Sequence, residues 1–356
     1  MWLVIAGLVM MAACADDQAL DVNPQDPADV APGDAQLSAE EVDPAPLSRV
    51  EADAVPAVAR RVIRRAPTHP VHPSGASVAC HALPGQADLT SEIVSGTHVV
   101  VWDGIDREVI VRVPDRGSGA DSPPPVMFNL HPSSSSAVRH DAEYTLSSEA
   151  VDRGYVVLVP EGVPPREEGE LQVWEFLPDD EHDDLGYLSA LVDWIGEGTC
   201  IDRERVYASG FSNGGTMAHL VACHSDGRFR AVAAVAAQRF PVSCPSGPIS
   251  VLGIHGTDDR IVPYTGGQLI RRPDIEMPDV ESTYEDWAEN GRCGPSVDEQ
   301  VADDVRVRRW SDCHDDVEVL LYTVFGGDHV WPRSEHPLWP SSIDATTMVL
   351  DFFDTH

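Results

Sequence analysis

The sequence has no lysine, and its basic residues are few. All 24 are arginine, against 59 aspartate and glutamate residues, which gives a formal net charge of −35 over 356 residues. A chain this acidic repels the phosphates of DNA and RNA, and it repels anionic lipid headgroups for the same reason. We therefore expect no nucleic-acid partner, and membrane contact only through a covalently attached lipid.

Long apolar runs are scarce as well. The run that begins "MWLVIAGLVMMAAC" has about a dozen apolar residues, too few to span a bilayer and typical of a signal-peptide core. Small residues just before Cys14 resemble a bacterial lipoprotein signal, in which the cysteine is acylated, although no basic residue precedes the run. The alternative is an ordinary secretory signal with Cys14 incidental. We expect residues 1–14 to be a lipoprotein-type signal and the protein to be extracytoplasmic, either lipid-anchored to the cell envelope or secreted.

Metal-binding patterns are missing too. No CxxC pair occurs, which argues against a zinc site or a thioredoxin-like centre. The acidic run at residues 179–184 lacks the regular ligand spacing of a calcium loop. We expect no metal and no cofactor. The six remaining cysteines are an even number, which in an exported chain suggests three disulfides.

The amino-acid composition of the chain changes near residue 78. Residues 15–77 are rich in Ala, Pro and Asp, and such a segment cannot bury enough apolar surface to offset its ordering entropy. We interpret 15–77 as an acidic disordered linker and 78–356 as one folded domain. No internal repeat is evident.

The folded part begins with a hairpin signal and then alternates strand and helix. The hairpin is predicted over residues 97–114, around Asp103-Gly104. Buried-strand runs follow at 124–132, 155–162, 205–212, 229–237, 249–256 and 317–327. Helix-like runs lie at 140–154, 183–198, 213–224, 279–291 and 342–356. This order predicts an α/β fold of the α/β-hydrolase type, with a mostly parallel central sheet and helices on both faces.

Three of the strand runs end in chemically reactive residues: Ser212 in "GFSNG", Asp259 in "HGTDD" and His329 in "GGDH". Carboxyl ends of parallel strands gather at one edge of a sheet. Taken singly, each residue is an ordinary loop residue or turn former. Together they have the order Ser, Asp, His expected of an α/β-hydrolase, in which an imidazole activates the serine and a carboxylate orients the imidazole.

Four segments carry a family resemblance: "RVYASGFSNGGTMAHLVAC", "HGTDDRIVPYTGG", "WAENGRC" and "GGDHVWP". The chain resembles the secreted polyhydroxybutyrate depolymerase and feruloyl esterase group of α/β-hydrolases, and the segments are dispersed over the whole folded domain. The resemblance implies Ser212 as nucleophile, Asp259 as acid and His329 as base. Asp258 is the weaker candidate, because the family's carboxylate falls on the second position after Gly-Thr.

The oxyanion hole departs from the family pattern. The resemblance implies that Asn213 offers its backbone N–H. The family has Leu-His-Gly after the third strand, whereas this chain has "NLHPSSSSA", and Pro132 has no N–H to donate. The second donor is then Ser133 or Ser134, or the hole is weakened.

Two tryptophans lie near these motifs. Trp174 follows the fourth strand, where the family often carries an aromatic residue near the substrate, and Trp331 stands two residues after His329. Either side chain lines the substrate cleft or packs in the core.

The resemblance also bears on the disulfides, because in this family the positions of Cys293 and Cys313 often pair. Cys223 ends the helix after Ser212 and Cys244 follows the next strand, which makes them neighbours in an α/β layout. Cys80 and Cys200 remain as the third pair.

Together these features indicate an exported serine carboxylic-ester hydrolase that works through an acyl-enzyme. Its substrate would be feruloyl or acetyl esters of polysaccharide, or polyhydroxyalkanoate-type polyesters, and we expect a monomer. The alternative is a non-catalytic cell-surface binding protein on a hydrolase scaffold, for which Pro132 is the best support.

Overall fold

Runs of apolar residues form the centre of one eleven-stranded sheet. In the computed structural model its order is β1-β2-β3-β5-β4-β6-β7-β8-β13-β12-β11. The central strands, from β5 to β13 in this order, run parallel to one another and are buried almost throughout. They are β4 (Val126–Leu130), β5 (Val156–Pro160), β6 (Val206–Phe211), β7 (Ala231–Val235), β8 (Ser250–Gly256) and β13 (Val319–Val324). Continuous apolar strands suit this position, because helices cover both faces of a parallel sheet.

The structure describes part of the chain. The described residues are 60–63, 93–115, 122–133, 135–164, 172–176, 180–239, 244–269, 272–336, 338 and 340–356. The predicted signal at 1–14 with Cys14, and all of the predicted linker except residues 60–63, lie outside them. Contacts divide the chain into Met1–Ala54 and Val55–His356, and every described residue belongs to the second unit. Within the described residues no helix is both long and apolar enough to cross a bilayer.

An antiparallel arm extends the sheet on one side. The predicted hairpin is confirmed as β2 (Gly96–Trp102) and β3 (Ile105–Arg112), joined by Asp103 (φ 49°) and Gly104 (φ 81°). Positive φ at both turn residues matches the twist of the flanking strands. One strand was not expected: β1 (Arg60–Val62) pairs with β2 from within the segment that we interpreted as a disordered linker.

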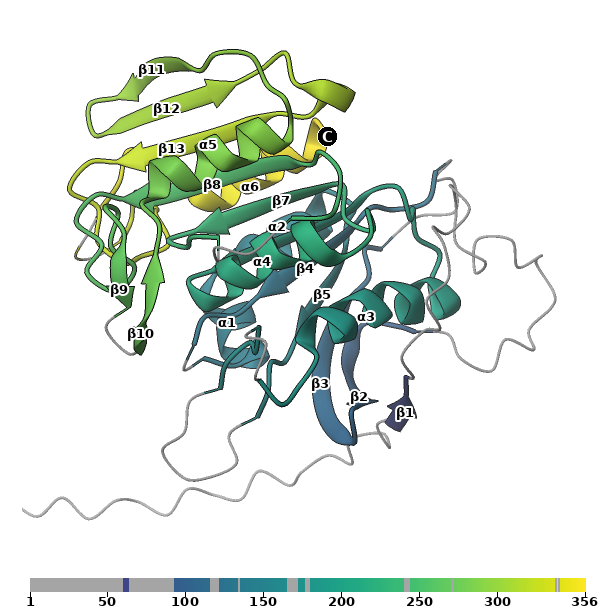
Figure 1. The fold of residues 1–356 in the computed structure, drawn as a ribbon. Coiled ribbons are helices and arrows are strands. Elements are labelled where there is room, and N and C mark those ends of the chain that lie inside the picture. The colour runs from purple at the N-terminus through teal and green to yellow at the C-terminus, as the bar shows by residue number, and fades with distance from the viewer. Residues whose placement is uncertain are drawn as a thin grey trace, which may run out of the picture. The chain divides into compact units, whose positions relative to one another are not determined.

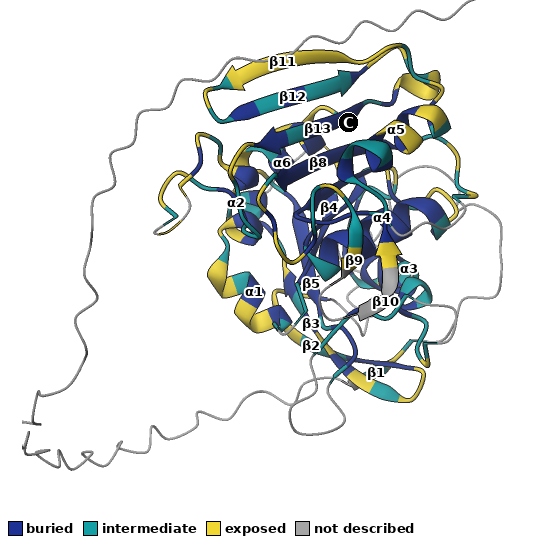
Figure 2. Cartoon of the chain, turned by 60° about the vertical axis from the view of Figure 1, so that its left-hand side comes forward, coloured by how far each residue is buried: buried dark blue, intermediate teal, exposed yellow. Residues whose placement is uncertain are grey.

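A second antiparallel arm extends the sheet on the other side, and the sequence pattern did not predict it. It consists of β12 (Val305–Trp310) and β11 (Val297–Ala302), with β11 at the edge. Figure 2 shows β11 largely in the colour of exposed residues. A short separate sheet, also not predicted, pairs β9 (Gly267–Leu269) with β10 (Arg272–Met277).

Helices cover both faces of the sheet, as predicted (Figure 1). One face packs in a core cluster with α3 (Asp184–Gly198), α4 (Asn213–His224) and α5 (Val280–Asn290). The other packs in a second cluster with α1 (Ala137–Glu143), α2 (Leu146–Asp152) and α6 (Ala345–Asp354). The predicted α/β fold with a mostly parallel central sheet is confirmed.

The helix expected over 140–154 is in fact two helices, α1 and α2. The break falls at Tyr144, whose backbone is extended (φ −120°, ψ 139°). Tyrosine and threonine, the two residues at the junction, are weak helix formers. The break places the Tyr144 ring against the rings of Phe211 and Trp331, with centroids 6.0 and 5.4 Å away.

Two of the predicted disulfides are present. Cys223 at the end of α4 is bonded to Cys244, and Cys293 after α5 is bonded to Cys313 after β12. Cys200 is also disulfide-bonded, whereas Cys80 lies outside the described residues, so the third pairing stays a prediction.

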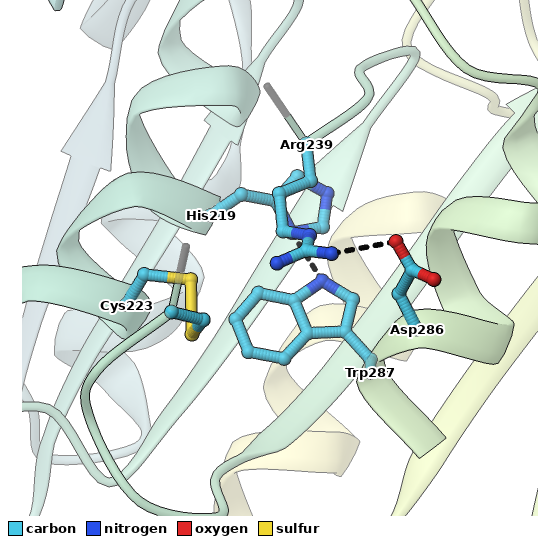
Figure 3. The surroundings of a disulfide bond; sticks show 6 residues. His219, Cys223, Arg239, Asp286 and Trp287 are labelled. Carbon is cyan, nitrogen blue, oxygen red and sulfur yellow. Dashed lines mark hydrogen bonds and ion pairs between the residues drawn. A yellow bond between two sulfur atoms is a disulfide. The ribbon is translucent and has the colours of Figure 1, made fainter. Parts of the chain in front are cut away.

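The first of these disulfides lies beside a buried aromatic cluster that joins α4 to α5 (Figure 3). Burial lowers the pKa of His219 on α4 to about 3, so its ring is neutral. Its Nδ1 accepts a hydrogen bond from Nε1–H of Trp287 on α5, at 3.1 Å. The guanidinium of Arg239 lies 5.3 Å from the Trp287 ring centroid and forms an ion pair with Asp286 at 2.7 Å. Disulfide and cluster together fix the helix that begins after Ser212.

Candidate active site

The turn from β6 to α4 holds Ser212 in a strained backbone conformation. Its φ is 55° and its ψ is −121°, values that residues other than glycine rarely adopt. The turn also brings backbones too close for side chains. A Cβ on Gly210 would lie 2.3 Å from the Gly214 backbone, and a Cβ on Gly214 would lie 2.2 Å from the carbonyl oxygen of Leu130. The glycines around Ser212 are therefore required by the turn itself.

The structure brings the Ser212 and Asp259 side chains to opposite sides of the His329 ring. His329 Nε2 lies 2.9 Å from Ser212 Oγ, and His329 Nδ1 lies 2.7 Å from Asp259 Oδ2. Since a carboxylate can only accept, Nδ1 carries the proton and Nε2 is free to accept from the serine hydroxyl. The three residues follow the carboxyl ends of β6, β8 and β13, where the strand pattern places them.

Asp259 is held as a buried carboxylate. It is 4% exposed, and its Oδ1 accepts hydrogen bonds from the backbone N–H of Ile261 (2.9 Å) and Val262 (2.8 Å). Burial by itself would raise the pKa of Asp259, but the hydrogen bonds from His255 and His329 outweigh it and hold the pKa well below its ordinary value. Asp259 is therefore ionised and able to orient the imidazole.

Asp258 lies outside this chain of hydrogen bonds. Its side chain is exposed, and the hydroxyl of Thr257 donates to its Oδ1 at 3.3 Å. Its backbone N–H donates to the carbonyl of Gly327 at 2.9 Å, so the residue contributes to the turn between the two loops. Of the two adjacent carboxylates, Asp259 is the one in contact with His329.

Sequence reasoning missed a second histidine at Asp259. The His255 ring is 1% exposed, and its Nε2–H donates to the carbonyl of Val262 at 2.8 Å. The same nitrogen lies 3.3 Å from Asp259 Oδ2. The shorter distance makes the Val262 carbonyl the main acceptor, and Asp259 receives the weaker share of the bond. The His-Gly step before Asp259 in the motif was the available signal.

The loop after β4 contains Pro132 and the serines expected to supply the second oxyanion donor. Burial lowers the pKa of His131 to about 4, so its ring is neutral. Its Nδ1–H donates to the Pro132 carbonyl at 2.9 Å, and its Nε2 accepts from the Gly162 backbone N–H at 2.9 Å. Ser133 is partly exposed beside Pro132, whereas Ser134 lies outside the described residues.

The other proposed oxyanion donor, Asn213, is the first residue of α4. Backbone N–H groups in the first turn of a helix have no partner within it, so the N–H of Asn213 is suited to an oxyanion. Its side chain faces Trp174, whose backbone N–H donates to Asn213 Oδ1 at 2.7 Å.

The two tryptophans are both buried, which favours packing over a place on the cleft wall. Trp174 is 2% exposed and Trp331 is 3% exposed. Nε1–H of Trp331 donates to Thr346 Oγ1 of α6 at 3.2 Å. The ring that contacts the base is that of Phe211, which stacks on His329 with centroids 5.0 Å apart and planes 30° apart.

Comparison with known proteins decides the family. The sequence model of the prolyl oligopeptidase family matches residues 143–239. The chain is 27% identical over 236 residues to "Feruloyl esterase B" of Piromyces equi, across 63% of this chain and 42% of the relative. It is 32% identical over 201 residues to "Probable feruloyl esterase C" of Aspergillus oryzae, across 54% of this chain and 68% of the relative. The chain belongs to the feruloyl esterase group of α/β-hydrolases.

A solved structure agrees on the fold. Acetyl xylan esterase from Aspergillus awamori superimposes with a TM-score of 0.53 at 13% identity, over 74% of this chain and 100% of that one. The expected fold is thus confirmed by the structural neighbour, and the expected family by the sequence relatives. Feruloyl esterase B is the longer protein, and the match spans less than half of its length.

A further carboxyl group, which is half-buried, supports the β4 loop in this member of the feruloyl esterase group. Glu161 follows β5, and its Oε2 accepts a hydrogen bond from the Ala137 backbone N–H at 2.8 Å. Its Oε1 accepts from the amide of Gln172. Burial raises the pKa of Glu161 from 4.5 to about 7, although both hydrogen bonds act in the opposite direction.

Glu161→Gln is expected to stabilise the protein at alkaline pH. Because the folded-state pKa of about 7 exceeds the ordinary 4.5, the wild type loses stability as pH rises from 4.5 to 7, and the loss is complete above 7. Glutamine keeps one of the two acceptor oxygens and removes the charge of this half-buried group. The melting temperature of the variant should exceed that of the wild type by a few degrees at pH 8, with little difference at pH 4.5. Glu204→Gln, at an exposed carboxylate, is the matched control, and an equal gain there would refute the explanation.

The two disulfides are expected to differ in their effect on activity. Their sequence separations are 21 and 20 residues, so removing either should lower the free energy of unfolding by roughly 3 kcal/mol through loop entropy. Only the Cys223–Cys244 bond fixes the helix that begins at Ser212. Cys223→Ala/Cys244→Ala should therefore also lower ester hydrolysis several-fold at a temperature where it remains folded. Urea unfolding and initial rates measure the two effects, with Cys293→Ala/Cys313→Ala as control. Equal rates for both double variants would contradict the assignment.

Proposed function

We propose that the protein is a serine esterase that forms an acyl-enzyme on Ser212. The observation that carries the proposal is the hydrogen-bonded series of Ser212, His329 and Asp259 at distances of 2.9 and 2.7 Å. Membership of the feruloyl esterase group supports the reaction class.

In this mechanism His329 acts first as base and then as acid. Nε2 takes the proton of Ser212 as Oγ attacks the ester carbonyl, and the ionised Asp259 stabilises the imidazolium that forms. The negative oxygen of the tetrahedral intermediate is placed at the backbone N–H of Asn213 and at a second backbone N–H from the loop after β4. Among the described residues of that loop, Ser133 is the candidate for this second donor. His329 then protonates the leaving alcohol, and a water activated in the same way hydrolyses the acyl-enzyme.

The substrates we propose are feruloyl or acetyl esters of polysaccharide. Two of the relatives are named feruloyl esterases, and the structural neighbour is named an acetyl xylan esterase. Disulfides are typical of proteins outside the cytoplasm, which supports an extracytoplasmic location. The lipid anchor at Cys14 belongs to the same proposal.

A fluorophosphonate probe tests the reaction class directly. The probe labels a serine that a neighbouring base activates, so the wild type should be labelled at Ser212, and peptide mapping should find no other site. An unlabelled wild type would favour the alternative of a binding protein on an inactive scaffold.

A substrate panel tests the ester class. Methyl ferulate, acetylated xylan, p-nitrophenyl esters of increasing chain length and polyhydroxybutyrate film should be compared under identical conditions. Higher kcat/KM on methyl ferulate or acetylated xylan than on the other esters is the expected result. Preferential erosion of the film would move the assignment to polyesters.

A further inference from the structure

The short segment that contains Trp174 is anchored at the carboxyl end of β5. Val163 and Val173 form an antiparallel bridge, in which the Val163 N–H donates to the Val173 carbonyl at 2.9 Å. Gly162 makes this approach possible, because a Cβ there would lie 2.5 Å from the same Val173 carbonyl oxygen. Trp174 therefore directly follows a residue that is hydrogen-bonded to the chain just after β5.

The main chain of Trp174 pairs with the residue after the nucleophile. Its N–H donates to Asn213 Oδ1 at 2.7 Å, and its carbonyl accepts from Asn213 Nδ2 at 3.4 Å. A primary amide that uses both its donor and its acceptor on one backbone residue has a defined orientation. This pair of bonds therefore fixes the first residue of α4, whose backbone N–H is the proposed oxyanion donor.

The side chain of Trp174 reaches the opposite loop. Its Nε1–H donates to the carbonyl of His131 at 2.9 Å, and its indole lies 5.0 Å from the His131 ring at an interplanar angle of 33°. This carbonyl belongs to the peptide that joins His131 to Pro132. Because Pro132 has no N–H, the loop cannot be held through a hydrogen bond at that nitrogen.

Both residues of the Trp174–His131 hydrogen bond are buried, and the loop after β4 is in direct contact with α4. Trp174 is 2% exposed and His131 is fully buried. A Cβ on Gly214 would lie 2.6 Å from the His131 carbonyl oxygen. A buried carbonyl that loses its donor stays unsatisfied unless the chain moves, so loss of the indole N–H should displace the loop relative to α4.

We infer that Trp174 is a positioning residue that sets the spacing between the two halves of the oxyanion hole. Its backbone holds Asn213 on one side, and its indole holds the His131–Pro132 peptide, and with it Ser133, on the other. The inference rests on the proposed esterase function. It gives the buried tryptophan a role in stabilising the transition state without contact with the substrate.

Trp174→Phe removes the indole N–H and keeps a large aromatic ring. We expect kcat for p-nitrophenyl acetate to fall 10- to 100-fold, less than the 10²- to 10³-fold typical of losing a whole oxyanion donor. KM should change less than about 3-fold, because the ground-state ester makes little use of the hole. The inhibition constant of phenylboronic acid, whose tetrahedral serine adduct places an oxygen in the hole, should rise in step with the fall in kcat.

Trp102→Phe is the matched control. Trp102 is also 2% exposed, and its Nε1–H donates to the carbonyl of Asp183 at 2.9 Å. The same chemical change there should lower the melting temperature to a similar extent and leave kcat and the phenylboronic acid constant unchanged. A double-mutant cycle adds Asn213→Ala, which removes the bonds to the Trp174 main chain. If both variants disturb one hole, their combined loss should be smaller than the product of the single losses.

The outcomes separate the inference from the function on which it rests. Wild-type kcat in Trp174→Phe, or an equal loss in Trp102→Phe, would overturn the positioning role while leaving the esterase assignment intact. A rise in KM with unchanged kcat would also overturn it, because it would indicate contact with bound substrate. A wild type that neither hydrolyses esters nor reacts with fluorophosphonate would overturn the proposed function and the inference together.

Discussion

Ser212→Ala is expected to abolish ester hydrolysis, with kcat for p-nitrophenyl acetate falling on the order of 10⁶-fold. The hydroxyl is the group 2.9 Å from His329 Nε2, and no acyl-enzyme can form without it. Alanine fits the turn, since Cβ is already present at this position, so the fold should be unaffected. Initial rates and a melting curve on the same preparation measure the two quantities.

A second serine on the same strand provides the control. Ser209 is buried in β6, and its hydroxyl has no hydrogen-bond partner among the described residues. Ser209→Ala should therefore leave activity within about 2-fold of the wild type, since removing an unpaired hydroxyl costs little. More than a small residual activity in Ser212→Ala would assign the nucleophile elsewhere.

Asp259→Asn is expected to lower kcat by about 10⁴-fold. Asparagine keeps the shape of the side chain but removes the charge that stabilises the imidazolium. It also presents an amide that can donate to Nδ1 of His329, which favours the tautomer in which Nε2 carries the proton and cannot accept from Ser212. Steady-state kinetics with p-nitrophenyl acetate measure the loss.

Asp258→Asn is the comparison that isolates the position. The change is chemically identical and lies one residue away, on an exposed side chain that contacts Thr257 rather than His329. Activity should remain within about 3-fold of the wild type, as for most surface substitutions. Equal losses in both variants would leave the acid unassigned, and a reversed order would move it to Asp258.

The centre of the fold could be predicted because burial on both faces leaves a plain signal in the sequence. The runs "VMFNL" of β4 and "AVAAV" of β7 are apolar at every position except Asn129, and every residue in them is buried. The strand β11 has the sequence "VDEQVA", with five exposed residues in succession. Its place in the sheet comes from pairing with β12, which an alternation pattern cannot reveal. The linker strand β1 was missed for the same reason.

Part of the candidate site could be predicted from the sequence, and part could not. Ser212, Asp259 and His329 follow strand ends, so local pattern and chain order were sufficient to bring them together. The contacts of Trp174 were not accessible in this way, because its partners Asn213 and His131 are 39 and 43 residues distant in sequence. Whether a tryptophan lines a cleft or joins two loops depends on such distant partners. The motif indicated the position of an aromatic residue but not the hydrogen bonds that it makes.

The acidic outer strand of the sheet has a consequence for self-association. A free strand edge offers unpaired N–H and C=O groups to a second copy of the chain, which can lengthen the sheet across two molecules. On β11 the exposed Asp298 and Glu299 stand at that edge, and the arginines that neutralise Asp298 lie behind it on β12. Two copies meeting edge to edge would bring carboxylates against carboxylates, and like charges at facing positions oppose pairing. The exposed, charged character that hid β11 from sequence analysis thus opposes the pairing of two copies at this edge.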